Sequence, residues 1–478
     1  MAVSLPAFNF HGKNVLVIGA GISGFAAAKI ARQMGAAVTL SDAKAESELK
    51  GDVPTLAELK DMGVRLVFGK QSAELLADVT HVILSPAVPL RIPLVAQALE
   101  KNIPVLSEVE LAYRLAKSPL CAVTGTNGKT TTTTLLGKLL ATRYAKVGVG
   151  GNIGVPLSEV ALEIGEGGCI AAEISSYQME ATHLFHPHVS AILNVTPDHL
   201  LRHGSMEVYQ AMKERIFAEE TAADFLVLNY DDSRTRAMKE RAKCQVCYFS
   251  RKEELPEGAF VENERLVLKW QGKRHELCAV AELGIKGAHN VENALAAAAM
   301  AFLAGAEPEK MAPVLKEFRG VEHRIEYVGK LRDVPFYNDS KATNTDSAIK
   351  ALATFPGHII LLAGGDDKMT DLTAFMELTV ERVEELILIG DAAQRFKEAA
   401  LKQGYPAEHI HLVGYSMEKA VELAAGLAKA PQVVLLSPAC ASFDMYGGFE
   451  ERGRDFKRLA GMLPGFVSVA TETKGNLV

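Results

Sequence analysis

Short runs of apolar, largely β-branched residues recur along the chain, and each is followed by a glycine-rich or polar turn and then by helical periodicity. These runs lie at residues 14–19, 80–86, 121–125, 190–196, 224–229, 358–365, 385–390 and 432–438. Alternation of apolar strands with helical segments predicts parallel β-sheets whose strands are joined by crossover helices. We therefore expect an α/β fold.

The length of 478 residues indicates more than one hydrophobic core. One boundary is expected within residues 104–120, where a short amphipathic stretch leads into Pro119 and a new strand. We expect three domains, namely a Rossmann-like domain over residues 1–107, a central domain over residues 108–320, and a second Rossmann-like domain over residues 321–478.

The first strand runs into a Gly-x-Gly-x-x-Gly motif at residues 19–24, which precedes a helix and a second strand ending at Asp42. This is the Rossmann spacing, with an acidic residue about twenty positions after the glycines. Open backbone N–H groups at the start of the helix suit a diphosphate. The pattern alone favours NAD or FAD, and the alternative is a tight turn that binds nothing.

A second glycine motif, VTGTNGKTTTTT at residues 123–134, joins an apolar strand to a helix. Backbone N–H groups of such a loop wrap phosphates, Lys129 would contact the β- and γ-phosphates, and the Thr130 hydroxyl would bind Mg²⁺. Val123 stands where the stricter pattern has glycine, and Gly125 takes that role. The sequence predicts a variant P-loop on a parallel sheet of the ATPase type, and hence a site for a nucleoside triphosphate.

Threonine is a poor helix former, so five in a row at a helix start point to another purpose. Their hydroxyls can satisfy N–H groups of the first turn or bond back to a carbonyl. Thr131 is expected near phosphate as well, whereas the threonines at 132–134 are expected to be structural.

Polar residues also follow other strands at their carboxyl ends, where parallel sheets bind ligands. Glu173 ends one strand, and His199 follows another beside an acid. Later clusters follow the strands of the third segment: Asp339, Ser340, Lys341 and Thr343, then Asp366, Asp367 and Lys368. Lys341 and Lys368, together with Arg324, predict a positively charged entrance to a site. The alternative is a surface on which these charges are paired in salt bridges. The helical sequence pattern around Lys213 indicates a solvent-exposed lysine.

Composition excludes several classes of protein. The net charge is −7 and no basic run occurs, so nucleic acid is not expected as a partner. No signal peptide and no apolar stretch long enough for a membrane span is seen. Six cysteines in so long a chain favour reduced thiols over a disulfide framework. We expect a cytoplasmic protein without membrane insertion.

The motifs TGTNGKTTT, EISSYQ, NVTPDHL, HNVENALAA, GVEHRIE, NDSKATN, LLAGGDDK and SPACASFD with GGFEERG, in this order, resemble the Mur ligases of bacterial cell-wall synthesis. The resemblance covers nearly the whole chain. It implies that the first domain holds the UDP part of a substrate, which replaces the interpretation as an NAD or FAD domain. It also implies that the third domain binds an amino acid.

The resemblance implies an ATP-dependent amide ligase that adds D-glutamate to UDP-N-acetylmuramoyl-L-alanine through an acyl phosphate, with two Mg²⁺ ions. A monomer is expected. The implied catalytic residues are Lys129, Glu173, His199 and Lys213, and the implied metal ligands are Thr130, Glu173, His199 and Lys213. Lys213 would act after carbamylation by CO₂, which requires a neutral amine that burial or a neighbouring cation can favour.

Further contacts follow from the same resemblance. The residues implied for ATP are Gly125, Thr126, Asn127, Gly128, Lys129, Thr130, Thr131, Asn290, Asn293, Arg324, Asp339 and Lys341. Those implied for the UDP substrate are Gly21, Ile22, Ser23, Asp42 and Asn152. Those implied for D-glutamate are Lys341, Thr343, Lys368, Ser442 and Phe449.

Other interpretations stay open at this point. An alanine-adding Mur ligase would resemble GTHGKT where this chain has GTNGKT, and the DNPR motif of the diaminopimelate and lysine adders is absent. Folylpolyglutamate synthase lacks the leading domain. From other classes, a nicotinamide oxidoreductase fused to an NTPase module and a non-catalytic nucleotide-binding scaffold remain. Titration with NADH and with a UDP-sugar tests the oxidoreductase, because NADH binding with no effect of the UDP-sugar would favour it.

Overall fold

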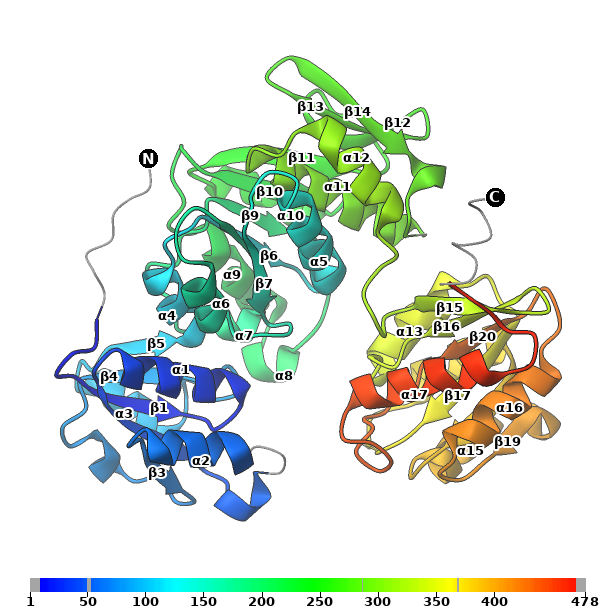
Figure 1. The fold of residues 1–478 in the computed structure, drawn as a ribbon, viewed down its shortest axis with the longest axis horizontal. Helices are drawn as coiled ribbons and strands as arrows, with labels where there is room; N and C mark the ends of the chain where they lie inside the picture. Colours follow the sequence, from blue (N-terminus) through cyan, green and yellow to red (C-terminus); the bar gives the residue numbers. More distant parts are fainter. Residues whose placement is uncertain (1–8, 50–52, 286, 368, 470–478) are drawn as a thin grey trace. The chain divides into compact units, whose positions relative to one another are not determined.

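The computed structural model describes residues 9–49, 53–285, 287–367 and 369–469 (Figure 1). The chain divides into two compact units, Met1–Phe318 and Arg319–Val478. The first unit contains a five-stranded and a nine-stranded sheet, and the second contains a seven-stranded sheet. Most strand pairs are parallel, which confirms the expected α/β class.

The first sheet has the strand order β3-β2-β1-β4-β5, and all its pairs are parallel. Its strands are β1 (Asn14–Ile18), β2 (Ala37–Asp42), β3 (Arg65–Phe68), β4 (His81–Leu84) and β5 (Val105–Ser107). Its helices are α1 (Ile22–Gln33), α2 (Val53–Asp61), α3 (Pro93–Glu100) and α4 (Glu108–Leu115), with short 3₁₀ turns η1 (Glu46–Glu48) and η2 (Ala73–Leu76).

Alternate residues of β1 enter two different cores, which explains why the whole strand is apolar. Val15 and Val17 pack with α1 and α2 on one face, whereas Leu16 and Ile18 pack with α3 on the other. Side chains of successive strand residues point to opposite faces, so a sheet covered on both sides needs a continuous apolar run. The first sheet is therefore doubly wound.

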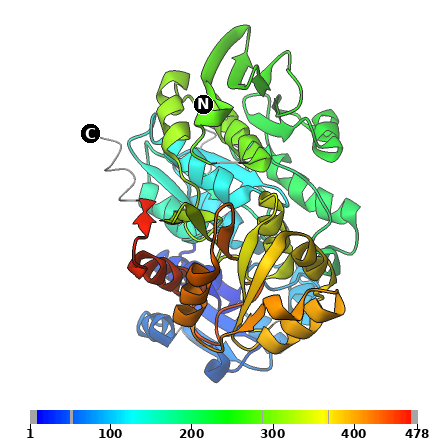
Figure 2. The same ribbon diagram turned by 90° about the vertical axis from the view of Figure 1, so that its right-hand side faces the viewer.

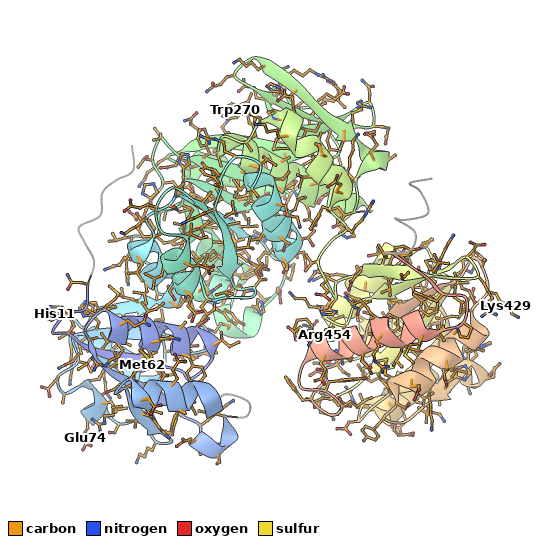
Figure 3. The ribbon with its side chains drawn as sticks, viewed as in Figure 1. His11, Met62, Glu74, Trp270, Lys429 and Arg454 are labelled. Atoms are coloured by element: carbon orange, nitrogen blue, oxygen red, sulfur yellow. The ribbon has the colours of Figure 1, made fainter. Side chains whose placement is uncertain are left out.

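The central sheet has the order β14-β13-β12-β11-β10-β9-β6-β8-β7. Its parallel strands are β6 (Leu120–Thr124), β7 (Val147–Gly151), β8 (Cys169–Glu173), β9 (Val189–Ile192), β10 (Phe225–Asn229), β11 (Gln245–Ser250) and β12 (Gly258–Glu262). An antiparallel edge that the sequence pattern did not indicate, green in Figures 1 and 2, is completed by β13 (Arg265–Trp270) and β14 (Lys273–Ala279). Trp270, labelled in Figure 3, ends β13.

Helices of the central part connect these strands, except α11 and α12, which follow the last strand β14. They are α5 (Lys129–Leu140), α6 (Leu157–Ile164), α7 (Ser176–Met179), α8 (Leu200–His203), α9 (Met206–Glu214), α10 (Ser233–Arg236), α11 (Ala288–Leu303) and α12 (Pro308–Glu317). Short 3₁₀ turns are η3 (Arg215–Phe217), η4 (Ala237–Arg241) and η5 (Val280–Glu282). The alanine-rich α11 is buried over most of its length and packs against α5, since small side chains allow close approach of the two helices.

The sheet of the second unit has the order β19-β18-β17-β20-β16-β15-β21. Its strands are β15 (Glu326–Leu331), β16 (Val334–Asn338), β17 (Ile359–Gly364), β18 (Val383–Ile389), β19 (Ile410–Leu412), β20 (Val433–Leu436) and β21 (Val467–Ser468). The helices are α13 (Thr345–Thr354), α14 (Thr373–Arg382), α15 (Ala393–Lys402), α16 (Met417–Leu427) and α17 (Phe449–Met462), with a 3₁₀ turn η6 (Ala407–His409). The two strands β15 and β21 are antiparallel to their neighbours, a second departure from the uniform parallel pattern.

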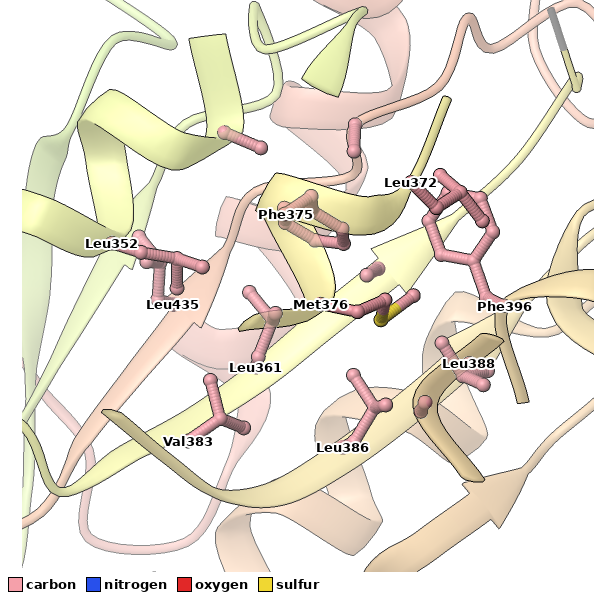
Figure 4. Close-up of a cluster of buried hydrophobic side chains, with 14 of the residues drawn as sticks. Leu352, Leu361, Leu372, Phe375, Met376, Val383, Leu386, Leu388, Phe396 and Leu435 are labelled. Carbon is pink, nitrogen blue, oxygen red and sulfur yellow. The ribbon is translucent and has the colours of Figure 1, made fainter. Parts of the chain in front are cut away.

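The helices cover both faces of this sheet. Figure 4 shows the core on one face, where Leu361 of β17 and Leu386 of β18 lie beside Phe375 and Met376 of α14. On the other face, α16 and α17 pack over Ile360 and Leu362. No helix within the described residues has the length and apolar character that a membrane crossing requires.

Candidate active site

The loop between β6 and α5 has the backbone shape that the P-loop motif requires. Gly125 and Gly128 have φ angles of 152° and 83°, which L side chains rarely adopt. A Cβ atom on Gly128 would lie 2.2 Å from Asn293 Oδ1. Both the backbone angle and the close approach of α11 therefore demand glycine at position 128.

Two lysines from distant parts of the sequence meet at this loop. Lys129 Nζ donates hydrogen bonds to Gly125 O at 2.8 Å and to Thr126 O at 2.9 Å. Lys213 Nζ, from α9, donates to the same Gly125 O at 2.9 Å. Two amino groups thus lie where a phosphate chain would meet the loop.

Lys213 is not the solvated helix lysine that its sequence pattern indicates. Only 1% of its surface is exposed, and its ammonium lies 4.5 Å from the centre of the Tyr209 ring. Burial lowers the pKa of Lys213 well below its ordinary value, and the positive charge of Lys129 lowers that pKa further. Both conditions that favour a neutral amine are therefore present.

Glu173, at the end of β8, is a buried carboxylate with one committed oxygen. Its Oε1 accepts a hydrogen bond from Asn152 Nδ2 at 2.8 Å, and Oε2 has no hydrogen-bond partner among the described residues. Thr130 lies in the first turn of α5, next to Lys129. An uncompensated buried carboxylate oxygen and a hydroxyl are hard donors that suit Mg²⁺. The donor set fits the expected metal.

No group of three or more histidine, cysteine, aspartate or glutamate side chains within the described ranges could by itself hold a metal ion. A metal at this loop would therefore rely on phosphate oxygens and hydroxyls besides Glu173. This combination is typical of Mg²⁺ bound with a nucleotide rather than of a structural metal site.

His199 follows β9 and caps α8 in a left-handed conformation, with φ of 54°. Its Nδ1 lies 3.1 Å from the Tyr177 hydroxyl, and its Nε2 lies 3.5 Å from Asp198 Oδ2. The imidazole remains 47% exposed. Two neighbours thus hold the ring while it stays open to a ligand.

Asn194 holds the histidine loop against the P-loop, a role that its position after a strand did not reveal. Its Oδ1 accepts from Asn127 N at 2.8 Å, and its Nδ2 donates to Asn127 O at 3.2 Å. Thr126 Oγ1 adds contacts to Thr196 O and to the Tyr209 hydroxyl. Lys129, His199 and Lys213 therefore belong to one hydrogen-bonded group of loops.

The threonines of α5 differ in burial: Thr130 and Thr134 are partly buried, and the expected phosphate contact of Thr131 stays a prediction. Those at 131–133 are buried, and Thr132 Oγ1 donates to Asn293 Oδ1 at 3.3 Å. Asn293 Nδ2 in turn donates to Asn290 Oδ1 at 3.1 Å. The two asparagines proposed for adenine thus lie side by side on α11, and Asn293 also supports the P-loop.

The glycine motif of the first sheet forms a tight turn at the start of α1. Gly19 has φ of 102°, and a Cβ atom on Gly24 would lie 1.8 Å from Gly19 O. Asp42 Oδ2 accepts from Ala20 N at 2.7 Å, so this carboxylate supports the turn itself. Ile22 is 67% exposed.

Of the three residues expected at the diphosphate, Gly21 and Ile22 are exposed and Ser23 is partly buried. They lie at the N-terminus of α1, whose first N–H groups need acceptors. This surface can bind an anion, as the sequence predicts for the position.

In the second unit, Asp339 follows β16 and is buried. Its Oδ2 accepts from Ser437 Oγ at 2.8 Å and its Oδ1 from Ile325 N at 3.2 Å. Burial raises the pKa of Asp339 to about 7, although Ser437 and the nearby Arg324 lower it. This carboxyl therefore titrates near neutral pH.

Of the residues expected at D-glutamate, Lys341 and Thr343 follow β16, Ser442 follows β20, and Phe449 begins α17. Lys341 Nζ lies 5.8 Å from the centre of the Phe449 ring, and Ser442 is 2% exposed. Thr343 is partly buried and its N–H donates to Lys341 O. Lys368 lies outside the described residues. The structure brings Lys341 and Phe449 together at one edge of the sheet.

Arg452 of α17 joins these loops, and sequence reasoning missed it. Its guanidinium is buried and donates to Ser340 Oγ at 3.0 Å, Ser340 O at 2.9 Å, Ala441 O at 2.9 Å and Cys440 O at 3.1 Å. Burial lowers its pKa to about 10. An arginine in FEERGR on a helix reads as solvated, so only three-dimensional contacts reveal it.

Comparison with known proteins supplies an independent description. The family model for the Mur ligase MurD-like N-terminal domain matches residues 13–107. The model for the Mur ligase middle domain matches residues 123–301, and that for the Mur ligase glutamate ligase domain matches residues 323–440.

Curated relatives match nearly the full chain. UDP-N-acetylmuramoylalanine–D-glutamate ligase of Thermoanaerobacter pseudethanolicus is 45% identical over 447 residues, covering 94% of this chain and 98% of that protein. The protein of the same name from Caldanaerobacter subterraneus is 47% identical over 446 residues, covering 93% and 97%.

Solved structures are similar in fold. MurF from Acinetobacter baumannii gives a TM-score of 0.56 at 18% identity, covering 92% of this chain and 93% of that one. A pseudomurein peptide ligase type C from Methanothermus fervidus gives 0.53 at 20% identity, covering 94% and 100%. At such identities the likeness concerns the fold alone.

Proposed function

This chain belongs to the Mur ligase family, and on that premise we propose that it is an ATP-dependent ligase joining D-glutamate to UDP-N-acetylmuramoyl-L-alanine. The observation that carries the proposal is the near-full-length match, at 45–47% identity, to two relatives bearing the name of that activity. The product would be a precursor of peptidoglycan, made in the cytoplasm by a monomeric enzyme.

The reaction has two steps. The alanine carboxylate attacks the γ-phosphorus of ATP, so that ADP leaves and an acyl phosphate forms. The amine of D-glutamate then attacks the acyl carbon, phosphate leaves, and an amide remains. A carboxylate near a triphosphate is repelled, so the first step requires positive charge around both groups.

Lys129 and bound Mg²⁺ would supply that positive charge. Lys129 would leave its contacts with Gly125 O and Thr126 O and bind the β- and γ-phosphates. When bound, Mg²⁺ would neutralise phosphate charge, and Thr130 and Glu173 are the residues that would hold it. The free Oε2 of Glu173 supports this assignment. His199 and, once carbamylated, Lys213 would hold a second Mg²⁺.

We assign Lys213 as the site of carbamylation. Its buried amine, whose pKa is lowered by burial and by Lys129, can attack CO₂ in its neutral form, giving a carbamate and releasing one proton, and the resulting anion would lie next to Lys129. Incubation with ¹³C-bicarbonate should produce a carbamate NMR signal that Lys213→Ala abolishes. Lys213→Ala should lose most activity and regain part of it with added short carboxylic acids. Activity untouched by the substitution would remove the assignment.

The remaining contacts are proposed by the same reasoning. Gly21, Ile22 and Ser23 would hold the diphosphate, Asp42 would lie near the uracil, and Asn152 near the muramoyl-alanine part. The second set comprises Asn290 and Asn293 at adenine, Arg324 at the phosphates, and Asp339 and Lys341 close to ATP. Lys341, Thr343, Lys368, Ser442 and Phe449 would surround D-glutamate. The domain boundaries proposed are 107/108 and 320/321.

Substitution of Lys129 tests the proposal at the phosphate. Lys129→Ala should lower kcat for amide formation by at least 100-fold, since the variant loses a charge on the phosphates that the transition state needs. Lys138→Ala, an exposed lysine on the same helix, is the matched control and should turn over like wild type. Undiminished turnover by Lys129→Ala would contradict the mechanism.

A further inference from the structure

Arg202 of α8 connects two parts of the first unit that are distant in sequence. Its Nη1 donates to Ala87 O at 3.1 Å, and its Nη2 donates to Pro86 O at 3.3 Å and to Val88 O at 3.1 Å. These carbonyls belong to the turn after β4, in the first sheet. Arg202 itself lies three residues after His199, in the central part.

The guanidinium is held in one orientation by Glu180. Nε and Nη2 of Arg202 donate to the two carboxylate oxygens at 2.9 Å and 2.8 Å. The side chains are only 12% and 13% exposed. A shielded bidentate pair is geometrically well defined and is weakly screened, unlike an exposed ion pair.

On its other side, Arg202 contacts the ring that holds His199. Its Cζ lies 4.7 Å from the centre of the Tyr177 ring. The Tyr177 hydroxyl lies 3.1 Å from His199 Nδ1. Arg202 therefore touches both the turn after β4 and the residue that orients the imidazole.

The turn after β4 in turn supports the glycine motif of the first sheet. A Cβ atom on Gly19 would lie 2.6 Å from Ser85 Cβ and 2.9 Å from Val88 Cγ2. Ser85 N also donates to Ile18 O at 2.9 Å. The backbone at Gly19 and the turn at 85–88 thus pack without spare room, and a shift of one displaces the other.

We infer that Arg202 is a positioning residue that couples occupancy of the glycine motif to the orientation of His199. The inference rests on the proposed function, in which that motif binds the UDP substrate and His199 serves the reaction. Arg202 would thus transmit a coupling free energy between the binding of the UDP substrate and the binding of ATP.

Calorimetry measures that coupling directly. The Kd for UDP-N-acetylmuramoyl-L-alanine is determined with and without a non-hydrolysable ATP analogue and Mg²⁺. We expect the wild type to bind at least 5-fold more tightly with the analogue. Arg202→Lys keeps the charge but cannot bridge three carbonyls and a carboxylate. The binding ratio, which is the Kd for the UDP substrate without the analogue divided by the Kd with it, should therefore fall below 2 in this variant. Its Kd for the ATP analogue alone should stay within 2-fold of wild type.

Kinetics provide a second readout. Arg202→Lys should lower kcat at least 10-fold with little change in the KM for ATP, whereas partial unfolding would lower kcat without altering the binding ratio. Arg274→Met is the matched control, because it removes the pair with Glu262 (Nε to Oε2, 3.1 Å) on the antiparallel edge. Its ratio and kcat should equal those of wild type.

Two results would overturn the inference: a wild-type ratio near 1, or an unchanged ratio in Arg202→Lys. If Arg202→Lys does not fold, Tyr177→Phe replaces it, since it keeps the Glu180 pair and removes only the hydroxyl at His199. An unchanged ratio there is equally contradictory. Wild-type turnover with D-glutamate tests the proposed function separately, so the two failures are distinguishable.

Discussion

Burial distinguishes several candidate residues in each of the two units. Lys213 is buried near a second cation, Glu173 has a buried oxygen with no partner among the described residues, and Asp339 has a pKa raised to about 7. Residue type and position after a strand indicated Glu173 and Asp339. The character of Lys213 was not visible in the sequence, because it depends on packing from Tyr209 and Lys129.

Gly128 provides a test of the P-loop at this scale. Gly128→Ala should lower the affinity for ATP at least 10-fold and cost about 1–3 kcal/mol of stability, because of the positive φ and the 2.2 Å approach of Asn293 Oδ1. Gly167→Ala is the control, since its φ is 79° and no atom lies within 4 Å of the added Cβ. ATP titration measures the affinity, and denaturant unfolding measures the stability, of both variants. Equal losses in the two variants would contradict the role of the close contact.

Glu220, before β10, makes the stability depend on pH. Burial raises its pKa from 4.5 to about 8. Below pH 4.5 both states are protonated; between pH 4.5 and 8 only the folded state keeps the proton, so stability falls as pH rises. At about 1.4 kcal/mol per pKa unit, the total loss is a few kcal/mol.

Unfolding by urea at pH 5 and pH 9 measures the effect. Glu220→Gln should remove most of the fall in stability between these pH values relative to wild type. Glu219→Gln, at the exposed neighbouring position, should keep the wild-type dependence. A dependence unchanged in Glu220→Gln would show that another group is responsible.

At the scale of helices and strands, the candidate site residues lie at the carboxyl ends of parallel strands, as the sequence predicts. Loops after β6, β8 and β9 form the group around Lys129, and loops after β16 and β20 form that around Lys341. Apolar runs followed by polar clusters were sufficient for this, since parallel strands end at a common edge. Contacts that join loops, such as those of Asn194 and Arg452, could not be predicted, because they involve partners about 70 and 112 residues away in the chain.

Substitution of Arg452 tests whether this residue positions the loops after β16 and β20. Arg452→Met should raise the KM for D-glutamate at least 10-fold with less effect on ATP, and should lower stability by several kcal/mol, because buried carbonyls after β16 and β20 lose their donor. Arg454→Met, an exposed arginine of the same helix (Figure 3), is the control. Steady-state kinetics measure the KM for D-glutamate, and thermal unfolding measures the loss of stability. A KM for D-glutamate equal to that of Arg454→Met would contradict the positioning role.

The whole molecule combines three sheets, each with its own cores, in two compact units. Periodicity was enough to predict the α/β class and the mostly parallel pairing. It did not predict the antiparallel strands β13–β15 and β21, since β13, β14 and β15 carry charged residues in place of a continuous apolar run and β21 has only two residues. The proposed substrate rests on the names of the most similar relatives reported above and not on the fold.

The most direct measurement is phosphate release from ATP by the full chain with UDP-N-acetylmuramoyl-L-alanine and each of D-glutamate, L-glutamate, L-alanine, L-lysine and meso-diaminopimelate, with the amide product verified by mass. Release should require both the UDP substrate and Mg²⁺, and only D-glutamate should support turnover. Equal turnover with another amino acid, or phosphate release without amide formation, would contradict the account.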